Sequence, residues 1–350
     1  MEERVLVPTY AETLEMLCIQ AGGNDRAEEL FGGCLQNVMR RVPPFLIGSS
    51  FPEMYLEFPL AGDPFCDLTL LLGELSTECR IDSPIAADTD SLLGFYSKVQ
   101  ANGLCTKDGG GVSFGFEIDC SSPDPVAAGV YFQPRKRHEL VRPFCEAAGN
   151  AAAADLYLAQ NARMSPGWEL SYLGMFQGRE GSPLRVGGYV DAIEKDRCAD
   201  DPTRISRILQ NAGFPAIHGE AFAQAARVMH LAPSKIDFQI DVLPDGRLGD
   251  AFAIEVFFDC GSSASARESF TEGAGAQVVS QCREWGIADE RAERMVDMAF
   301  MRALPVEIVE GVRAFFYFKT MPCWLKLRWV NGILQPAKMY YFMLAGPIPA

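Results

Sequence analysis

Cationic and phenolic side chains recur on alternate positions in the segment LKLRWVNGILQPAKMYYFML, Leu325–Leu344. The pair Asn331-Gly332 in its middle is the strongest short signal for a tight hairpin turn. Alternate residues of a strand point to the same face, so a hairpin here would gather three cations and a phenol on one face. That much like charge needs an anionic partner. The four side chains are Lys326, Arg328, Lys338 and Tyr340.

The overall charge contrasts with this local cluster. The chain has 350 residues, of which 48% are hydrophobic and 22% charged, with a net charge of −15 and a pI near 4.7. This composition is typical of a globular protein and argues against nucleic-acid binding and against docking on an anionic membrane. An anionic substrate would need a local positive pocket.

The cysteines and the N-terminus predict a cytoplasmic protein. The 11 cysteines are scattered, without a C-x-x-C pair, and the opening residues MEERVLVPTY lack the pattern of a signal peptide. No apolar run is long enough to span a membrane. We therefore expect reduced, mostly buried thiols and no structural zinc site.

Helical segments and strand pairs alternate five times along the chain. Helical spacing and capping signals predict helices over 9–21, 25–42, around 92–99, and over 138–164, 202–212, 220–230, 269–285 and 289–304. Strand-like runs predict five hairpins between them, at 54–72, 112–133, 168–190, 235–258 and 314–344.

This order predicts an α/β fold of five helix–hairpin repeats in a single domain over residues 1–350. Hairpins, rather than single strands, between helices argue against a Rossmann sheet, in which crossovers join parallel strands. Ten antiparallel strands could close into one barrel surrounded by the helices, with a lumen wide enough for ligand and water.

The strand faces agree with a barrel that has a polar lumen. In the fourth hairpin, Ile236 and Phe238 alternate with Asp237, Gln239 and Asp241. The apolar face would lie under the helices and the polar face in the lumen. The commoner cause of such alternation is a sheet with a solvated face, and this alternative stays open.

The repeat pattern resembles the architecture of the ABBA prenyltransferases, which include bacterial aromatic, fungal indole and cyanobactin peptide enzymes. The ending AKMYYFML resembles the basic–x–Tyr–aromatic last strand of that group. The hairpin YLEFPLAGDPFCDLTLLL resembles their first hairpin, in which a glutamate serves as base or acceptor anchor, and Glu57 is the matching position. The resemblance spans about residues 9 to 345, and the acidic inner faces of hairpins two and four depart from the family pattern.

This resemblance implies a transferase that moves a prenyl group from a prenyl diphosphate to an aromatic or peptide acceptor. Glu57 would be catalytic, and Asp67 would help hold Mg²⁺ on the diphosphate oxygens, with no organic cofactor. Lysines and arginines would stabilise the leaving diphosphate, and tyrosines would shield the allylic cation. The expected substrate-binding residues are Arg185, Lys235, Lys326, Arg328, Lys338, Tyr131, Tyr189, Tyr317 and Tyr340.

Two other readings remain open. The chain could be a non-catalytic barrel that binds a small molecule or peptide, or a different acid–base enzyme that uses an acidic lumen. The inner carboxylates could hold Mg²⁺, recognise a cationic acceptor, or pair with Lys and Arg across strands.

Overall fold

The computed structural model of the chain describes residues 53–63, 65–72, 113–118, 129–134, 137–176, 183–214, 219–258, 261–309 and 312–348. The helices predicted over 9–42 and around 92–99 lie outside these residues. No helix in the described part of the chain is long and apolar enough to cross a membrane.

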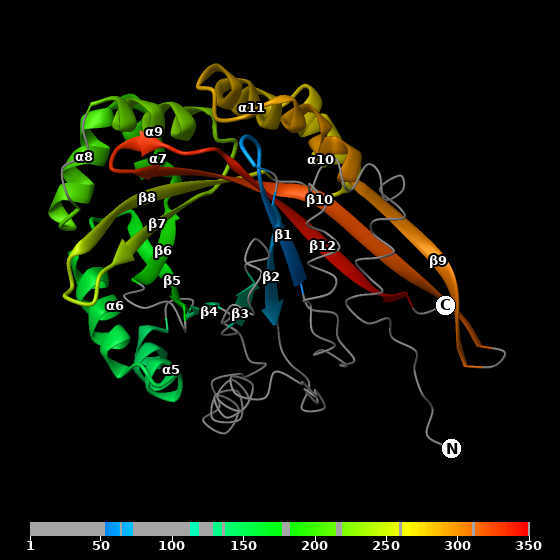
Figure 1. The fold of residues 1–350 in the computed structure, drawn as a ribbon, viewed down its shortest axis with the longest axis horizontal. Coiled ribbons are helices and arrows are strands. Elements are labelled where there is room, and N and C mark those ends of the chain that lie inside the picture. The colour runs from blue at the N-terminus through cyan, green and yellow to red at the C-terminus, as the bar shows by residue number, and fades with distance from the viewer. Residues whose placement is uncertain are drawn as a thin grey trace.

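The described strands form one strongly curled antiparallel sheet (Figure 1). Its order is β11-β10-β12-β1-β2-β3-β4-β5-β6-β7-β8, with β9 also paired to β10. The strands are β1 Glu53–Pro59, β2 Asp67–Leu72, β3 Ser113–Ile118, β4 Gly129–Gln133, β5 Trp168–Phe176, β6 Leu184–Val190, β7 Ile236–Val242, β8 Leu248–Phe257, β9 Phe300–Val309, β10 Val312–Val330, β11 Ile333–Leu334 and β12 Lys338–Ile348.

The described helices lie outside the curve of the sheet (Figure 1). Asp201 caps one of them through its side chain, and Pro202 follows at the first helical position, where its missing N–H costs nothing. The elements are the 3₁₀ helix η1 His138–Leu140, α5 Val141–Ala147, α6 Ala151–Arg163, α7 Ala192–Asp200, α8 Pro202–Asn211, α9 Glu220–Leu231, α10 Ser263–Thr271, α11 Ala274–Glu284 and the 3₁₀ helix η2 Glu290–Met298. The predicted mixed α/β fold with an antiparallel sheet and outer helices is confirmed.

The segment 289–304 differs from the predicted helix. It is a 3₁₀ helix only to Met298, and β9 then begins at Phe300. Phe300–Leu304 pair residue by residue with Phe316–Thr320 of the long strand β10. Pairing with the next strand along the chain therefore overrides the local helical composition. The helix α7 was not predicted from the sequence.

The two faces of the sheet differ in character as predicted. Ile236, Phe238 and Ile240 are at most 1% exposed and belong to the core beneath the helices. Asp237 and Gln239 point to the opposite, concave face, yet they are only 7% and 6% exposed. A sheet with a solvated polar face is therefore excluded for β7.

Strand β10 joins several parts of the sheet. Its residues Trp324–Val330 pair with β8, and Phe315–Lys326 pair with β12. A bulge between Pro322 and Trp324 shifts the register. Beyond the bulge, Trp324, Lys326 and Arg328 face the concave side.

Candidate functional site

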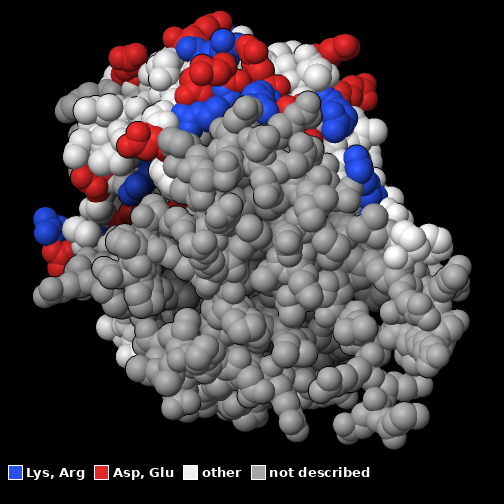
Figure 2. Space-filling view, turned by 45° about the vertical axis from the view of Figure 1, so that its right-hand side comes forward, with Lys and Arg blue, Asp and Glu red and all other residues white. Residues whose placement is uncertain are grey.

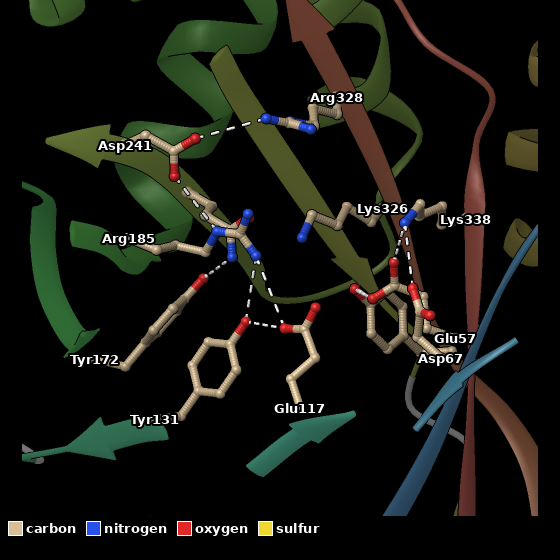
Figure 3. A network of polar contacts seen from close by, with 12 residues as sticks. Glu57, Asp67, Glu117, Tyr131, Tyr172, Arg185, Asp241, Lys326, Arg328 and Lys338 are labelled. Atoms are coloured by element: carbon tan, nitrogen blue, oxygen red, sulfur yellow. Dashed lines mark hydrogen bonds and ion pairs between the residues drawn. The ribbon is translucent and has the colours of Figure 1, made fainter. Parts of the chain in front are cut away.

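A cavity of about 530 Å³ opens on the concave face of the sheet. Charged side chains from β1, β2, β3, β6, β10 and β12 line it (Figure 3). The cations are Arg185, Lys326, Arg328 and Lys338. The carboxylates are Glu57, Asp63, Asp67 and Glu117. Six predicted site residues therefore meet in one cavity, although they are spread over most of the chain.

Glu57 lies at the centre of one cluster. The register of β1 places it opposite Tyr340 of β12 and Asp67 of β2. Lys338 donates to one carboxylate oxygen and Tyr340 to the other. Burial alone would raise the pKa of Glu57, but Lys338, Lys326 and these hydrogen bonds lower it to about 2. Glu57 is therefore a stable anion and a good hydrogen-bond acceptor, but a weak base.

Arg185 organises a second cluster. Its Nε lies 3.4 Å from Asp241 and its Nη1 lies 3.8 Å from Glu117. The same Nη1 donates to the hydroxyl of Tyr131 at 3.3 Å, and Tyr131 donates to Glu117. Arg328 approaches Asp241 from β10 at 3.6 Å. Two arginines are thus held by carboxylates on the wall of the cavity.

Lys326 lies between the two clusters (Figure 3). It is only 7% exposed, and it forms an ion pair with Glu255 at 3.6 Å. Its Nζ also lies 6.0 Å from the centre of the Tyr340 ring. Burial lowers the pKa of Lys326 despite the nearby carboxylates, so this ammonium would gain from an anionic ligand.

Tyr172 belongs to the site but was missed from the sequence. Its hydroxyl accepts a hydrogen bond of 2.8 Å from Gln239 on the concave face. A register shift between Leu170 and Tyr172 turns this ring toward the concave face. Without that shift, Tyr172 would point to the face opposite to that of Glu169, toward the helices. The ring lies against Gly187, where an added Cβ would come within 2.1 Å of it.

Five predicted substrate-binding residues do not line this cavity. Two of them, Tyr131 and Tyr340, donate hydrogen bonds to the lining residues Glu117 and Glu57. The other three, Lys235, Tyr189 and Tyr317, lie apart from it. Lys235 pairs with Asp237 at 2.9 Å, and Tyr189 donates to Glu169. Tyr317 pairs with Gly346 on β12. That position is six residues from Tyr340, or roughly 20 Å along a strand.

The predicted magnesium ligand Asp67 lies 4.0 Å from Lys338. Among the described residues, no group of three His, Cys, Asp or Glu side chains could hold a metal ion. Mg²⁺ often binds through one or two carboxylates plus substrate phosphates, so Asp67 fits a shared site of that kind. Its metal role stays a prediction.

The site is suited to binding an anion beside aromatic rings. Burial and Glu57 raise the pKa of Tyr340 well above its ordinary value, so its phenol stays neutral. Its ring stacks on Trp324 at 4.6 Å between centroids. Cations, neutral phenols and an anchored carboxylate therefore lie side by side.

No protein-family model and no curated protein matches the chain. Solved structures match it over nearly its full length. PriB in a binary complex with product diphosphate matches with a TM-score of 0.53 and 13% identity, over 95% of this chain and 96% of that chain. The 5-dimethylallyltryptophan synthase from Streptomyces coelicolor matches with a TM-score of 0.48 and 14% identity, over 95% of each chain. AnaPT from Neosartorya fischeri matches with a TM-score of 0.47 and 10% identity, over 95% of this chain and 91% of that chain.

The likeness to PriB, a prenyltransferase, shows a shared fold. The predicted resemblance to the ABBA, or PT-barrel, prenyltransferases is confirmed at this level. A shared fold does not establish which acceptor this chain uses or which reaction it catalyses.

Proposed function

We propose that this protein transfers a prenyl group from a prenyl diphosphate to an aromatic or peptide acceptor. One observation carries the proposal: four cations from β6, β10 and β12 line one cavity beside Glu57. The fold shared with PriB supports it, because that structure holds product diphosphate.

We also propose that the sheet closes into a ten-stranded barrel around the cavity. The pairing of β10 with both β8 and β12, together with that of β12 with β1, supports closure. The two further strands, β9 and β11, would extend the rim. A closed wall would keep water from the reacting carbon.

The cations would act on the leaving group. The donor's carbon–oxygen bond breaks, and the diphosphate leaves with the electron pair. The allylic carbon then bonds to the acceptor, which would lose a proton to an oxygen of the departed diphosphate. Lys326 would stabilise the developing charge first, because it is buried and only weakly paired. Lys338 would exchange part of its contact with Glu57 for a diphosphate oxygen.

Glu57 would orient the acceptor rather than remove its proton. A carboxylate with a pKa of about 2 is a weak base but accepts hydrogen bonds well. The rings of Tyr340 and Tyr131 would face the allylic cation, and such contacts stabilise a cation by about 0.5–2 kcal/mol each. Where Mg²⁺ accompanies the donor, it would neutralise diphosphate charge, with Asp67 as a protein ligand.

Calorimetric titration with dimethylallyl thiolodiphosphate, with and without Mg²⁺, tests this proposal. Arg328→Ala and Lys338→Ala should each weaken binding by roughly 1.5–3 kcal/mol, the typical contribution of a charged hydrogen bond. Lys319→Ala is the matched control, because Lys319 lies on the same long strand but donates to the carbonyl of Gly261. No binding to the wild type, or equal affinity in all variants, would refute the proposal and favour the non-catalytic or acid–base alternatives.

A further inference from the structure

Two connections between strands form the rim of the cavity. The end of β1 and the turn that follows it contribute Pro59, Ala61, Gly62, Asp63 and Phe65 to the lining. The link between β11 and β12 contributes Gln335 and Pro336. Gly62 and Asp63 are also exposed, so the turn after β1 lies between the cavity and the solvent. Residues 60–63 and 65 are called the rim turn below.

A third segment, which joins α11 to η2, is bonded to both connections. The N–H of Asp289 donates to the carbonyl of Leu60 at 2.7 Å, and the N–H of Leu60 donates to the carbonyl of Ala337 at 2.7 Å. The N–H of Ala337 donates in turn to the carbonyl of Ile287 at 2.9 Å. These bonds bring together three segments that are far apart in the chain.

The side chain of Arg291 reaches the tip of the rim turn. Its Nη2 atom donates to the carbonyl of Gly62 at 2.7 Å. The same atom and Nε donate to the carboxylate of Asp289 at distances from 2.6 to 3.1 Å, which holds the guanidinium in one orientation. Gly62 has a φ of 81°, and a Cβ added there would meet no atom within 4 Å. Packing around Gly62 is therefore loose, and the position of the turn depends on hydrogen bonds such as the one from Arg291.

The pair of Arg291 and Asp289 differs from exposed ion pairs. On the face shown in Figure 2, the coloured Lys and Arg side chains lie among Asp and Glu, and exposed pairs contribute little to stability. The Arg291 side chain is only 14% exposed. Its Nη1 atom is buried and has no hydrogen-bond partner among the described residues. An unpaired buried donor lowers stability, so the geometry of this guanidinium is better explained by where it holds the rim turn.

The rim turn carries Phe65, whose ring lies against Lys338. The Nζ atom of Lys338 is 5.1 Å from the centre of that ring, within the range of a cation–π contact. Both residues line the cavity. A shift of the rim turn would therefore move an apolar ring away from an ammonium that would bind the diphosphate, and would admit water there.

We propose that Arg291 is a positioning residue for prenyl transfer. Its hydrogen bond to Gly62 holds the rim turn closed at the Lys338 end of the cavity, so that Phe65 excludes water from the allylic cation. Excluding water from a closed site prevents hydrolysis of a reactive intermediate. Arg291 does not line the cavity, so it acts through the turn. This inference rests on the proposed function.

An open rim turn has a defined chemical product. When the carbon–oxygen bond of the donor breaks, the diphosphate leaves with the electron pair. The oxygen of a water molecule then bonds to the allylic carbon, and the loss of a proton gives the prenyl alcohol. Losing a hydrogen bond from a charged group should make the open turn at least about tenfold more populated. Formation of the alcohol should rise by a similar factor.

Hydrolysis of dimethylallyl diphosphate in the absence of an acceptor measures this leak. Arg291→Met keeps the length of the side chain but removes its donors, and it should raise the rate of alcohol formation at least about tenfold. Arg291→Lys keeps one charged donor and should have an intermediate rate. Arg283→Met is the matched control with an unchanged rate, because Arg283 of α11 pairs with Glu293 of η2 and both side chains are exposed.

A double-mutant cycle separates positioning of the turn from a general loss of stability. Phe65→Ala should raise alcohol formation by itself, because the ring that excludes water is gone. Adding Arg291→Met to Phe65→Ala should then change the rate by less than about twofold, because the two residues act as one unit. A general loss of stability would instead add to the effect of Phe65→Ala.

Equal rates of alcohol formation for the wild type and folded Arg291→Met, or additive effects in the double mutant, would overturn the inference. If Arg291→Met does not fold, wild-type rates in both Arg291→Lys and Phe65→Ala would overturn it instead. Binding of dimethylallyl thiolodiphosphate to the wild type is measured alongside. A wild type that does not bind this analogue refutes the prenyl-transfer proposal and this inference with it. A wild type that binds it, with unchanged rates in the variants, refutes the role of Arg291 alone.

Discussion

Replacing Asp237 by Asn should stabilise the protein at pH 8 relative to the wild type, and the advantage should shrink toward pH 5. Burial raises the pKa of Asp237 from its ordinary value of 3.8 to about 7, with Lys235 opposing the shift and Glu255 adding to it. Tyr172 and Tyr189 also face this carboxylate from β5 and β6. The Asn side chain does not titrate, so the variant lacks the pH dependence that Asp237 causes.

The sign follows from proton binding. Between pH 3.8 and pH 7 the folded wild type keeps a proton on Asp237 that the unfolded chain has lost. Its stability therefore falls as the pH rises through this window and levels off above pH 7. From pH 5 to pH 7 the loss covers about two pH units at about 1.4 kcal/mol each, or about 3 kcal/mol.

Urea denaturation at pH 5, 6, 7 and 8 measures the effect as a difference between variant and wild type. That difference should change by about 3 kcal/mol in favour of Asn across the series. Asp245→Asn is the control: hydrogen bonds to Arg247 lower the pKa of this exposed carboxyl, so it is ionised in both states throughout. A difference for Asp237→Asn that stays constant from pH 5 to pH 8 would refute the reasoning.

Two further substitutions test the cavity wall. Glu57→Gln should slow prenyl transfer about a hundredfold, the typical cost of a misplaced substrate, because the acceptor loses its anionic anchor. It should also raise the affinity for dimethylallyl thiolodiphosphate, because Lys338 loses its nearest anionic partner; wild-type turnover with unchanged affinity would contradict the role of Glu57. Gly187→Ala should lower the free energy of unfolding by about 1–3 kcal/mol, because the added Cβ would lie 2.1 Å from the Tyr172 ring. Thermal unfolding measures this loss, and an unchanged melting temperature would show that the ring moves freely.

Much of the C-terminal half was predictable from local signals. The strand predicted at 168–176 matches β5 at both ends. The Asn331-Gly332 turn has both residues at positive φ, 51° and 77°, as a tight hairpin turn requires. Alternation also placed Glu57, Lys326 and Lys338 correctly on the concave face. Each of these features depends on residues close together in the chain.

The rest depends on how whole strands pair, which no short stretch of sequence specifies. The bulge in β5 reverses the direction of Tyr172, and nothing in the local pattern marks it. The pairing of β9 with β10 turns a predicted helix into a strand. The sequence also showed the acidic character of β7 and β8, but not that Asp237 and Glu255 lie opposite each other, because register is set by the whole sheet.

The pairing of β1 with β12 has a consequence for how the protein is made. Glu57 and Tyr340, whose side chains meet, lie 283 positions apart in the chain. During synthesis, β1 leaves the ribosome long before β12 exists, so the edge of β1 that pairs with β12 stays open until β12 has been made. Such long-range closure slows folding and exposes apolar strand edges in the meantime. The Glu57 cluster therefore cannot form before β12 has been made, and a chain shortened before Lys338 would lack β12, which pairs with both β1 and β10.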